Sequence, residues 1–311
     1  MRNIPSAACA SEGERKKMKI IDVLNSGKVS VSCELFPPKA GGNFSPVVQA
    51  ADAIAALRPD FMSVTYGAGG GTSQNTVAIA SHIQNDLGIT ALAHLTCVSS
   101  TKDHVAAMLD RLKEEHIENI LALRGDIPEG MDFPNPRQYR YAFELIDEIK
   151  ERGDFCIGAA CYPEGHVECK NKAEDLDHLK EKADRGCDFL TTQMFFDNNV
   201  LYSFLYRALL REIRLPVIAG VMPVTNQAQI QRICRLSGTS LTPKFKAIAD
   251  KFGDNPKALK QAGIAYATEQ IVDLIANGVR GIHIYTMNKP DVAAKIMQNI
   301  SYLLEDTNGT N

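Results

Sequence analysis

The fold is decided by the stretch VSVSCELFPPK at residues 29–39. Its β-branched and apolar residues predict a buried strand at 29–34, and the two consecutive prolines end that strand. Glu34 then lies at the carboxyl end of the strand, held by a stiff turn. This segment alone leaves two interpretations open. The acid is either a proton donor presented to a cleft or a solvated carboxylate at a strand end.

The same arrangement recurs along the chain, because apolar runs of strand length alternate with amphipathic segments. Strands are predicted at 29–34, 61–65, 90–96, 119–123, 155–161, 189–194, 216–221 and 281–285. Helices are predicted at 44–57, 72–87, 102–116, 139–152, 173–185, 200–211, 227–236 and 292–303. Strands that alternate with helices are parallel, and eight such units predict an α/β fold of the closed (β/α)8 TIM barrel type. An open doubly wound sheet is the competing fold.

The segment 243–277 is longer than one unit needs, which predicts one or two extra helices before strand eight. No linker or low-complexity stretch interrupts the pattern. We therefore expect a polar N-terminal extension at 1–18, a single (β/α)8 catalytic domain at 19–305 and a polar tail at 306–311.

Composition indicates a soluble globular protein, since 45% of the 311 residues are hydrophobic and 23% are charged. A net charge of −3 provides no general attraction to nucleic acid or to an anionic membrane. No apolar run approaches the roughly 18 residues that span a bilayer. The eight cysteines show no CxxC or zinc-ligand spacing, so we expect free thiols in a reducing cytoplasm.

A barrel of this type carries its active site at the carboxyl ends of the strands, where polar side chains should gather. Each predicted strand ends in such a group. They are Glu34; Thr65 and Tyr66; His94 and Thr96; Arg124, Gly125 and Asp126; Tyr162 and Glu164; Gln193 and Asp197; Thr225 and Asn226; and Tyr285, Thr286 and Asn288. A structural protein has no need of hydrogen-bonding groups at all eight tips.

The motif LRGD at 123–126 allows two interpretations. As a cofactor clamp, it would set Asp126 beside a ring that takes up charge and Arg124 near anionic groups, with Gly125 permitting close approach. As a local feature, it would be an ion pair or a turn. The glycine-rich loop at 67–72 lacks both the P-loop lysine and the GxGxxG spacing, so we interpret it as a flexible loop at the mouth of the site.

Three further groups also have alternatives. A metal role for His94, His166 and His283 lacks a completing acid at fixed spacing, which favours a satisfied polar residue or a cofactor contact. Asp175, His178 and Lys182 share one helix face, either solvated or part of a site. Gln193, followed by two phenylalanines, is placed either for a flat heterocycle or by core packing.

Taken together and in order, these motifs resemble the methylenetetrahydrofolate reductase family, as a bacterial-type catalytic barrel. The matching segments are CELFPPK at 33–39, SVTYGA at 63–68, AHLTC at 93–97, LRGD at 123–126, YPEGH at 162–166, TQMFFD at 192–197, GVMPV at 220–224 and HIYTMN at 283–288. They cover nearly the whole chain.

The resemblance implies an oxidoreductase of one-carbon metabolism and methionine supply. FAD takes hydride from NADH or NADPH and passes it to 5,10-methylenetetrahydrofolate, giving 5-methyltetrahydrofolate. Glu34 is implied as the proton donor that opens the five-membered ring, and Asp126 as a carboxylate near flavin and pterin. The role of Glu34 requires a protonated carboxyl group, and burial favours that neutral form.

The resemblance also implies the binding residues. Cofactor contacts fall on Thr65 (on the nicotinamide side), Tyr66, Ala68, His94, Arg124, Gly125, Asp126, Tyr141, Ala142, Tyr162, His166, Asp175, His178 and Lys182. Folate contacts fall on Gln193, Gln229 and Lys289. Relatives assemble as homo-oligomers, and the electron donor is NADH, NADPH or an iron–sulfur partner subunit.

Four positions depart from the family pattern: Lys289 replaces an arginine common in bacterial relatives, His178 an asparagine, Ile233 an aromatic residue and Glu181 a basic residue near the cofactor phosphates. Lysine keeps the charge but loses the bidentate fork. The chain ends near Asn311, so feedback control through the regulatory region of eukaryotic members is not expected.

Two other hypotheses remain open. One is a related flavin barrel acting on another cyclic amine, such as proline. The other is a subunit that binds folate or flavin without turnover, against which the intact Glu34, Asp126 and Gln193 argue.

Overall fold

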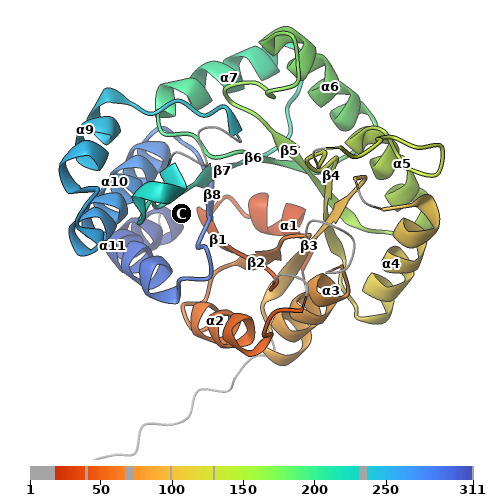
Figure 1. Cartoon of the computed structure of the whole chain (residues 1–311), viewed down its shortest axis with the longest axis horizontal. Helices are drawn as coiled ribbons and strands as arrows, with labels where there is room; N and C mark the ends of the chain where they lie inside the picture. Colours follow the sequence, from red (N-terminus) through yellow and green to blue (C-terminus); the bar gives the residue numbers. More distant parts are fainter. Residues whose placement is uncertain are drawn as a thin grey trace, which may run out of the picture.

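Eight parallel strands close into a barrel in chain order, with β8 paired back onto β1 (Figure 1). The structure is a computed structural model that describes residues 18–38, 41–66, 73–98, 100–128, 130–230 and 237–309. The strands are β1 (Ser30–Leu35), β2 (Phe61–Val64), β3 (Thr90–Thr96), β4 (Asn119–Leu123), β5 (Cys156–Cys161), β6 (Phe189–Thr192), β7 (Val217–Val221) and β8 (Gly281–Ile284). The predicted TIM barrel is confirmed, and the open sheet is wrong.

A ring of helices surrounds the barrel (Figure 1). They are α2 (Ser45–Ala55), α3 (Ser73–Ser81) with the π-helical turn η1 (His82–Asp86), α4 (Lys102–Glu114), α5 (Ala142–Arg152), α6 (Lys172–Asp184), α7 (Asn198–Leu210), α9 (Pro243–Phe252), α10 (Pro256–Ala276) and α11 (Pro290–Gly309). Helices α9 and α10 confirm the extra helices predicted before strand eight. Residues 227–230 are helical, and the rest of the helix predicted at 227–236 lies outside the described residues.

A short helix, α1 (Ile20–Leu24), was not predicted, and it lies across the ring of strands in Figure 1. Ile20 is fully buried and packs in a cluster with Phe61 and Phe189. Its backbone N–H donates to Oδ1 of Asn119 at 2.8 Å. Because these residues lie at the amino ends of the strands, α1 closes that end of the barrel.

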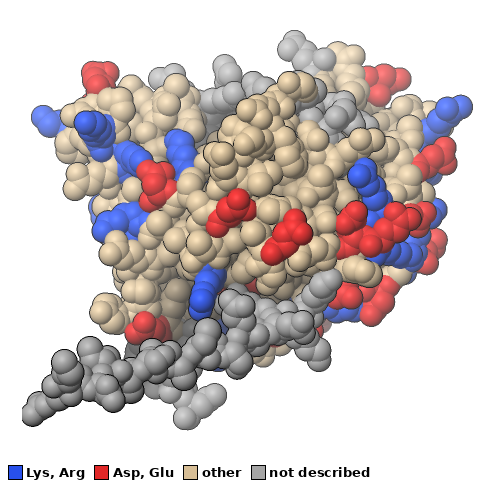
Figure 2. Space-filling view, turned by 90° about the horizontal axis from the view of Figure 1, so that it is seen from below, with Lys and Arg blue, Asp and Glu red and all other residues tan. Residues whose placement is uncertain are grey.

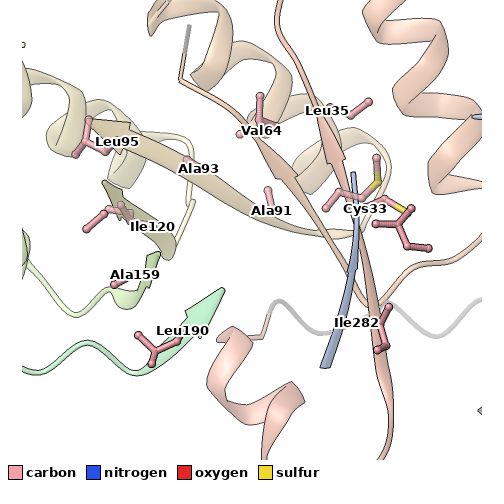
Figure 3. Close-up of a cluster of buried hydrophobic side chains, with 14 of the residues drawn as sticks. Cys33, Leu35, Val64, Ala91, Ala93, Leu95, Ile120, Ala159, Leu190 and Ile282 are labelled. Atoms are coloured by element: carbon pink, nitrogen blue, oxygen red, sulfur yellow. The ribbon is translucent and has the colours of Figure 1, made fainter. Parts of the chain in front are cut away.

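The main core lies between the strands and the helices. Every second strand residue points outward into it, among them Cys33, Leu35, Val64, Leu190 and Ile282 (Figure 3). The alternate residues point into the barrel. This two-residue period leaves the inward positions free for the site.

The helices α4 to α7 are joined by a repeated ion pair. In each, an arginine at the end of one helix contacts an aspartate of the preceding helix: Arg152 with Asp110, Arg185 with Asp147, and Arg211 with Asp177.

Figure 2 shows one face of the molecule, where basic and acidic side chains lie beside one another at the edge and the middle carries few charges.

Two further findings concern the environment of the protein. Within the described ranges, no helix has the length and apolar character needed to cross a membrane. The cysteines at 33, 97, 156, 161, 169 and 187 are free thiols.

Helix α11 includes part of the segment predicted as a tail at 306–311, and residues 1–17 lie outside the described ranges.

Candidate active site

A cavity of about 390 Å³ opens at the carboxyl ends of the strands, and residues from all eight strands or the loops after them line it. The polar tips predicted from the sequence account for much of the lining. Those that line this cavity are Glu34, Thr65, Tyr66, His94, Thr96, Arg124, Gly125, Asp126, Tyr162, His166, Gln193 and Tyr285.

The barrel interior has a polar side and an apolar side. The inward side chains of β8, β1, β2 and β3 are largely polar, and those of β4 to β7 are largely apolar. The polar set is Ser32, Glu34, Ser63, His94 and His283. The apolar set includes Leu121, Leu123, Gly158, Ala160, Phe189, Ile218 and Met222. In the cavity, acid–base groups therefore lie on one side and apolar side chains, among them Leu121, Leu123 and Met222, on the other.

Glu34 is the penultimate residue of β1 and is 5% exposed. Its backbone carbonyl accepts a hydrogen bond from the Thr286 hydroxyl at 2.6 Å, which ties β1 to the loop after β8. Its side-chain Oε2 lies 3.6 Å from Nε2 of His94 and 3.6 Å from Nε2 of His283. Of the two interpretations of this acid, the buried position in the cavity agrees with presentation to a cleft.

His94 is a neutral side chain in this site. Burial lowers the pKa of His94 to about 4, and His283 lowers it further, while the nearby Glu34 acts in the opposite direction. The Nε2 atom of His94 is buried and has no hydrogen-bond partner among the described residues. Since buried polar atoms are normally paired, a ligand in the cavity is the natural partner.

Tyr285 forms one wall of the cavity, and its hydroxyl donates to the Thr192 carbonyl at 2.6 Å. Burial, together with Glu34, raises the pKa of Tyr285 well above its usual value, so the phenol stays neutral. Gly220 makes this arrangement possible. A Cβ there would lie 2.5 Å from the Thr192 carbonyl oxygen and 2.6 Å from the Tyr285 ring.

A second cavity of about 200 Å³ adjoins the first, and Leu123, Arg124, Ala160, Tyr162 and His166 line both. The sequence placed cofactor contacts on helices α5 and α6, and the structure brings those residues to this second cavity. They are Tyr141, Ala142, Asp175, His178 and Lys182. The rings of Tyr141 and His178 stack with centroids 5.2 Å apart.

Asp175, which is buried, and Lys182, which is partly buried, bring opposite charges to the second cavity. Burial raises the pKa of Asp175, and the nearby Lys182 counteracts that shift. Burial lowers the pKa of Lys182, and Asp175 counteracts it in turn. The ammonium group donates to the Ala160 carbonyl at 2.8 Å, so Lys182 reaches from α6 to the end of β5. The face shared by Asp175, His178 and Lys182 is therefore turned toward a cavity.

Arg124 is held by an acid that the sequence did not indicate. Its guanidinium group donates to both carboxylate oxygens of Glu168, at 2.5 and 2.6 Å. This contact raises the pKa of Arg124 and lowers the pKa of Glu168. Neighbouring Gly125 has a φ of +84°, in the left-handed region that favours glycine. The ion pair that Arg124 forms is therefore with Glu168 and not, as the local alternative for LRGD had it, with Asp126.

The remaining predicted residues divide into three groups. Asp126 and Gln193 line the first cavity, Asp126 as an exposed side chain at its rim and Gln193 as a half-buried one. Gln229 and Lys289 line neither cavity, and the Lys289 ammonium group donates to the Thr225 hydroxyl at 2.7 Å. Ala68 lies outside the described residues, as does Ile233.

Besides Glu168, the lining residues that the sequence analysis did not single out include Thr191 and Cys169. The Thr191 hydroxyl is buried in the first cavity without a partner in the part of the chain that is described. Cys169 lines the second cavity. The period-two pattern of β6 could have identified Thr191, since it faces inward with Phe189. Across the described ranges, no group of three or more His, Cys, Asp or Glu side chains is arranged to hold a metal ion.

Comparison with known proteins identifies the family. Residues 19–301 match the family model of methylenetetrahydrofolate reductase. The chain belongs to this family. It is 31% identical over 291 residues to 5,10-methylenetetrahydrofolate reductase of Escherichia coli (strain K12), covering 94% of this chain and 96% of that protein. It is 32% identical over 305 residues to methylenetetrahydrofolate reductase (NADH) 1 of Arabidopsis thaliana, covering 93% of this chain and 52% of that protein.

The chain thus spans about half the length of the plant members of the family that it matches. Among solved structures, it is similar to an uncharacterized protein from Clostridium thermocellum that binds two copies of 5-methyl-5,6,7,8-tetrahydrofolic acid. The TM-score is 0.58 at 15% identity, covering 92% of this chain and 100% of that one. A 2,3-dimethylmalate lyase gives a TM-score of 0.51 at 12% identity, covering 94% of this chain and 87% of that one. At these identities the likeness concerns the fold alone.

Proposed function

We propose that this chain reduces 5,10-methylenetetrahydrofolate to 5-methyltetrahydrofolate, with FAD as cofactor and NADH or NADPH as electron donor. Family membership supports the reaction, and relatives that cover the whole barrel carry the corresponding name. The observation that carries the proposal is the divided interior. A buried carboxyl group lies on the polar side of a cavity whose opposite side is apolar.

The residues present fit a flavin. Leu121, Leu123 and Ala160 offer a flat apolar surface, and the unpaired Nε2 atom of His94 offers a hydrogen bond to a polar ring. The adjoining second cavity continues the site past two cations, Arg124 and Lys182, which suit a pyrophosphate. A bound flavin would supply hydride transfer between the nicotinamide and the folate.

The second cavity also contains three acids, Glu168, Glu174 and Asp175. Glu168 already neutralises Arg124, and Asp175 partly neutralises Lys182. With Glu181 in place of a basic residue near this region, the second cavity would offer a phosphate group no surplus positive charge. Binding of the cofactor would therefore depend more on burial of its rings than on charge.

Glu34 acts as the general acid in this proposal. It lines the cavity, so its carboxyl group can protonate a ring nitrogen of the bound folate, and its burial excludes the water that would compete for the proton. Asp126, at the rim, and Gln193, directly after β6, can hydrogen-bond the donor-and-acceptor edge of a pterin. Lys289 and Gln229, outside both cavities, are assigned to the glutamate tail of the folate.

Lys289 suits an extended anionic tail because it lies beyond the enclosed part of the site. Burial lowers the pKa of Lys289, and the neighbouring Lys260 lowers it further. A carboxylate ligand would reverse this shift by pairing with the ammonium group. The homo-oligomer and the iron–sulfur partner implied by the resemblance stay predictions.

Anaerobic half-reactions test the proposal. The purified protein should be yellow, its flavin should be reduced by NADH or NADPH, and 5,10-methylenetetrahydrofolate should reoxidise it. In Glu34→Gln we expect reduction at the wild-type rate and reoxidation slower by about 10²–10⁴-fold, the usual contribution of a positioned acid. Glu164→Gln is the matched control, because Glu164 lines neither cavity and its carboxylate accepts from the Ser240 backbone.

Three outcomes would contradict parts of this proposal. Equal reoxidation rates in wild type and Glu34→Gln would remove the acid assignment. A reduced wild type that the folate does not reoxidise would remove the function. Reduction of the flavin by proline would favour the cyclic-amine alternative instead.

A further inference from the structure

A chain of buried polar groups lies behind Glu34. Nδ1 of His283 is 2.7 Å from the Ser32 hydroxyl, and Nε2 of His283 is 3.6 Å from Oε2 of Glu34. The Ser63 hydroxyl also lies 3.4 Å from that Nε2 atom. All four side chains are at most 5% exposed. His283 does not line the cavity, so any effect it has on chemistry acts through Glu34.

The serine determines which nitrogen of His283 carries the proton. The Ser32 hydroxyl lies 3.2 Å from the Ile282 carbonyl, and a carbonyl oxygen can only accept. The Ser32 hydroxyl therefore donates its proton to the Ile282 carbonyl, and its oxygen accepts a hydrogen bond from Nδ1–H of His283. A neutral imidazole with its proton on Nδ1 presents an unprotonated Nε2, which is a hydrogen-bond acceptor facing Glu34.

We propose that His283 is a positioning residue for the catalytic proton: Ser32 locks it in the Nδ1–H form, so that a lone pair on Nε2, and not an N–H group, faces Oε2 of Glu34 at 3.6 Å. A lone pair beside the carboxyl group repels its ionised form and so favours the neutral acid. The opposite tautomer would donate from Nε2 to the carboxylate and favour the ionised, inactive form. Ser32, two residues before Glu34 on β1, thus determines whether His283 favours the neutral or the ionised form of Glu34. This inference rests on the proposed role of Glu34.

The other titratable groups around Glu34 leave this assignment intact. His94 on β3 faces the same carboxylate oxygen, and burial keeps it uncharged near neutral pH. Tyr285, directly after β8, packs edge-on to the His283 ring with centroids 5.1 Å apart, and its hydroxyl donates to the Thr192 carbonyl. From β2, the neighbour is the uncharged Ser63, and Phe61 stacks near the imidazole with centroids 6.4 Å apart.

The tautomer can be measured without any substitution. In the flavin-loaded protein labelled with ¹⁵N-histidine, we expect long-range ¹H–¹⁵N spectra to show His283 protonated on Nδ1 and bare on Nε2 at neutral pH. His283→Gln supplies the assignment by removing that signal. A wild-type His283 that is protonated on Nε2 alone, or on both nitrogens, would overturn the proposal.

The pH profile of reoxidation by the folate gives the second test. In Ser32→Ala the imidazole can adopt the Nε2–H form, so the pH midpoint above which reoxidation is lost should fall by about one unit, the scale of one altered hydrogen bond. Ser32→Thr keeps the hydroxyl and should restore the wild-type midpoint. Reduction of the flavin by the nicotinamide should be unchanged in both variants.

Ser30→Ala is the matched control, because Ser30 occupies the previous inward position of β1 and bonds a carbonyl, that of Arg280, without touching a histidine. Its midpoint should equal that of wild type. If Ser32→Ala and Ser30→Ala give the same midpoint, the positioning role is overturned while the acid role of Glu34 stands. If wild type is not reoxidised at all, it is the proposed function that has failed, and the tautomer spectrum still decides the geometry.

Discussion

The two ends of the barrel are built from the same eight strands but from opposite kinds of residue. At the amino end, Ile20 of α1 packs with Phe61, Leu92 and Phe189 in a closed apolar floor. At the carboxyl end, polar side chains line an open cavity with a buried acid and a neutral histidine. The comparison teaches that residues for stability and residues for chemistry can be only two residues apart on one strand, as Leu92 and His94 are on β3.

Removing one of the two phenylalanine rings of the floor, that of Phe189, should break this comparison most strongly. Phe189 is fully buried and fills the space beside Gly158, where a Cβ would lie 2.5 Å from its ring. Phe189→Ala should lower the free energy of unfolding by about 3–5 kcal/mol, because the ring leaves a cavity. Urea titration followed by circular dichroism measures this. The reoxidation rate per bound flavin should persist at low urea, and a loss of rate with unchanged stability would contradict the division between floor and mouth.

The cavity end of the barrel should make the free energy of unfolding depend on pH. The pKa of His94 is about 4 in the folded chain, below its ordinary value of 6.5, so the unfolded chain binds the extra proton between these two pH values. The stability that depends on a neutral His94 is fully present above pH 6.5. As the pH falls to 4, the free energy of unfolding should decrease by about 3 kcal/mol. Urea midpoints of wild type and His94→Gln across this window measure it. The variant should lose stability less steeply, and parallel curves would show that His94 does not titrate this way.

The hydrogen bonds of Asn119 within the apolar floor should contribute less to the free energy of unfolding. Asn119 accepts from the Ile20 backbone at 2.8 Å and donates to the carbonyls of Met18 and Ala91 at 3.3 and 3.4 Å. Asn119→Ala leaves these buried groups unpaired, so we expect a loss of about 1–3 kcal/mol. Hydrogen exchange should increase first in α1. Protection of α1 equal to that in wild type would show that packing of Ile20 alone holds the helix.

The rim of the mouth should contribute least to stability. Arg124 and Glu168 are partly exposed, with side chains 21% and 47% accessible, so Glu168→Gln should change the free energy of unfolding by less than about 1 kcal/mol. Flavin affinity, measured by quenching of its fluorescence, should rise because Arg124 becomes free for phosphate. Glu174→Gln is the control, since Glu174 lines the same cavity but accepts from the Lys170 backbone. Weaker binding in Glu168→Gln would mean that the acid orients the arginine for the cofactor.

The strands and most helices could be predicted because their signals are local. Alternating or continuous apolar runs placed all eight strands within two residues of their bounds. Helix α1 was missed because it has five residues and no side-chain cap, and it is held by tertiary packing of Ile20. The helix predicted at 139–152 begins at Ala142, since Tyr141 is extended and Glu144 accepts the backbone N–H groups of Arg140 and Tyr141. A glutamate at the third helical position was the available signal.

The site was predictable where it coincides with strand tips and not where loops supply it. Glu34, His94 and Gln193 follow from the barrel alone, because parallel strands end at one edge. Glu168 lies in a loop without periodicity, so its contact with Arg124 depends on tertiary structure. The contact of Lys289 with Thr225 likewise joins two loops that lie 64 residues apart.

The acid and its imidazole come from opposite ends of the chain. Ser32 and His283 are 251 residues apart, and they meet only where the last strand closes onto the first. Most predicted flavin contacts, from His94 to Lys182, lie on β3 to α6, within one continuous segment. During refolding, we therefore expect flavin binding to need chiefly the middle of the barrel, whereas the proposed protonation chemistry should need the ring to be complete. The rate at which reoxidation activity returns should therefore report the pairing of β1 with β8. This strand pair has the highest sequence separation in the sheet.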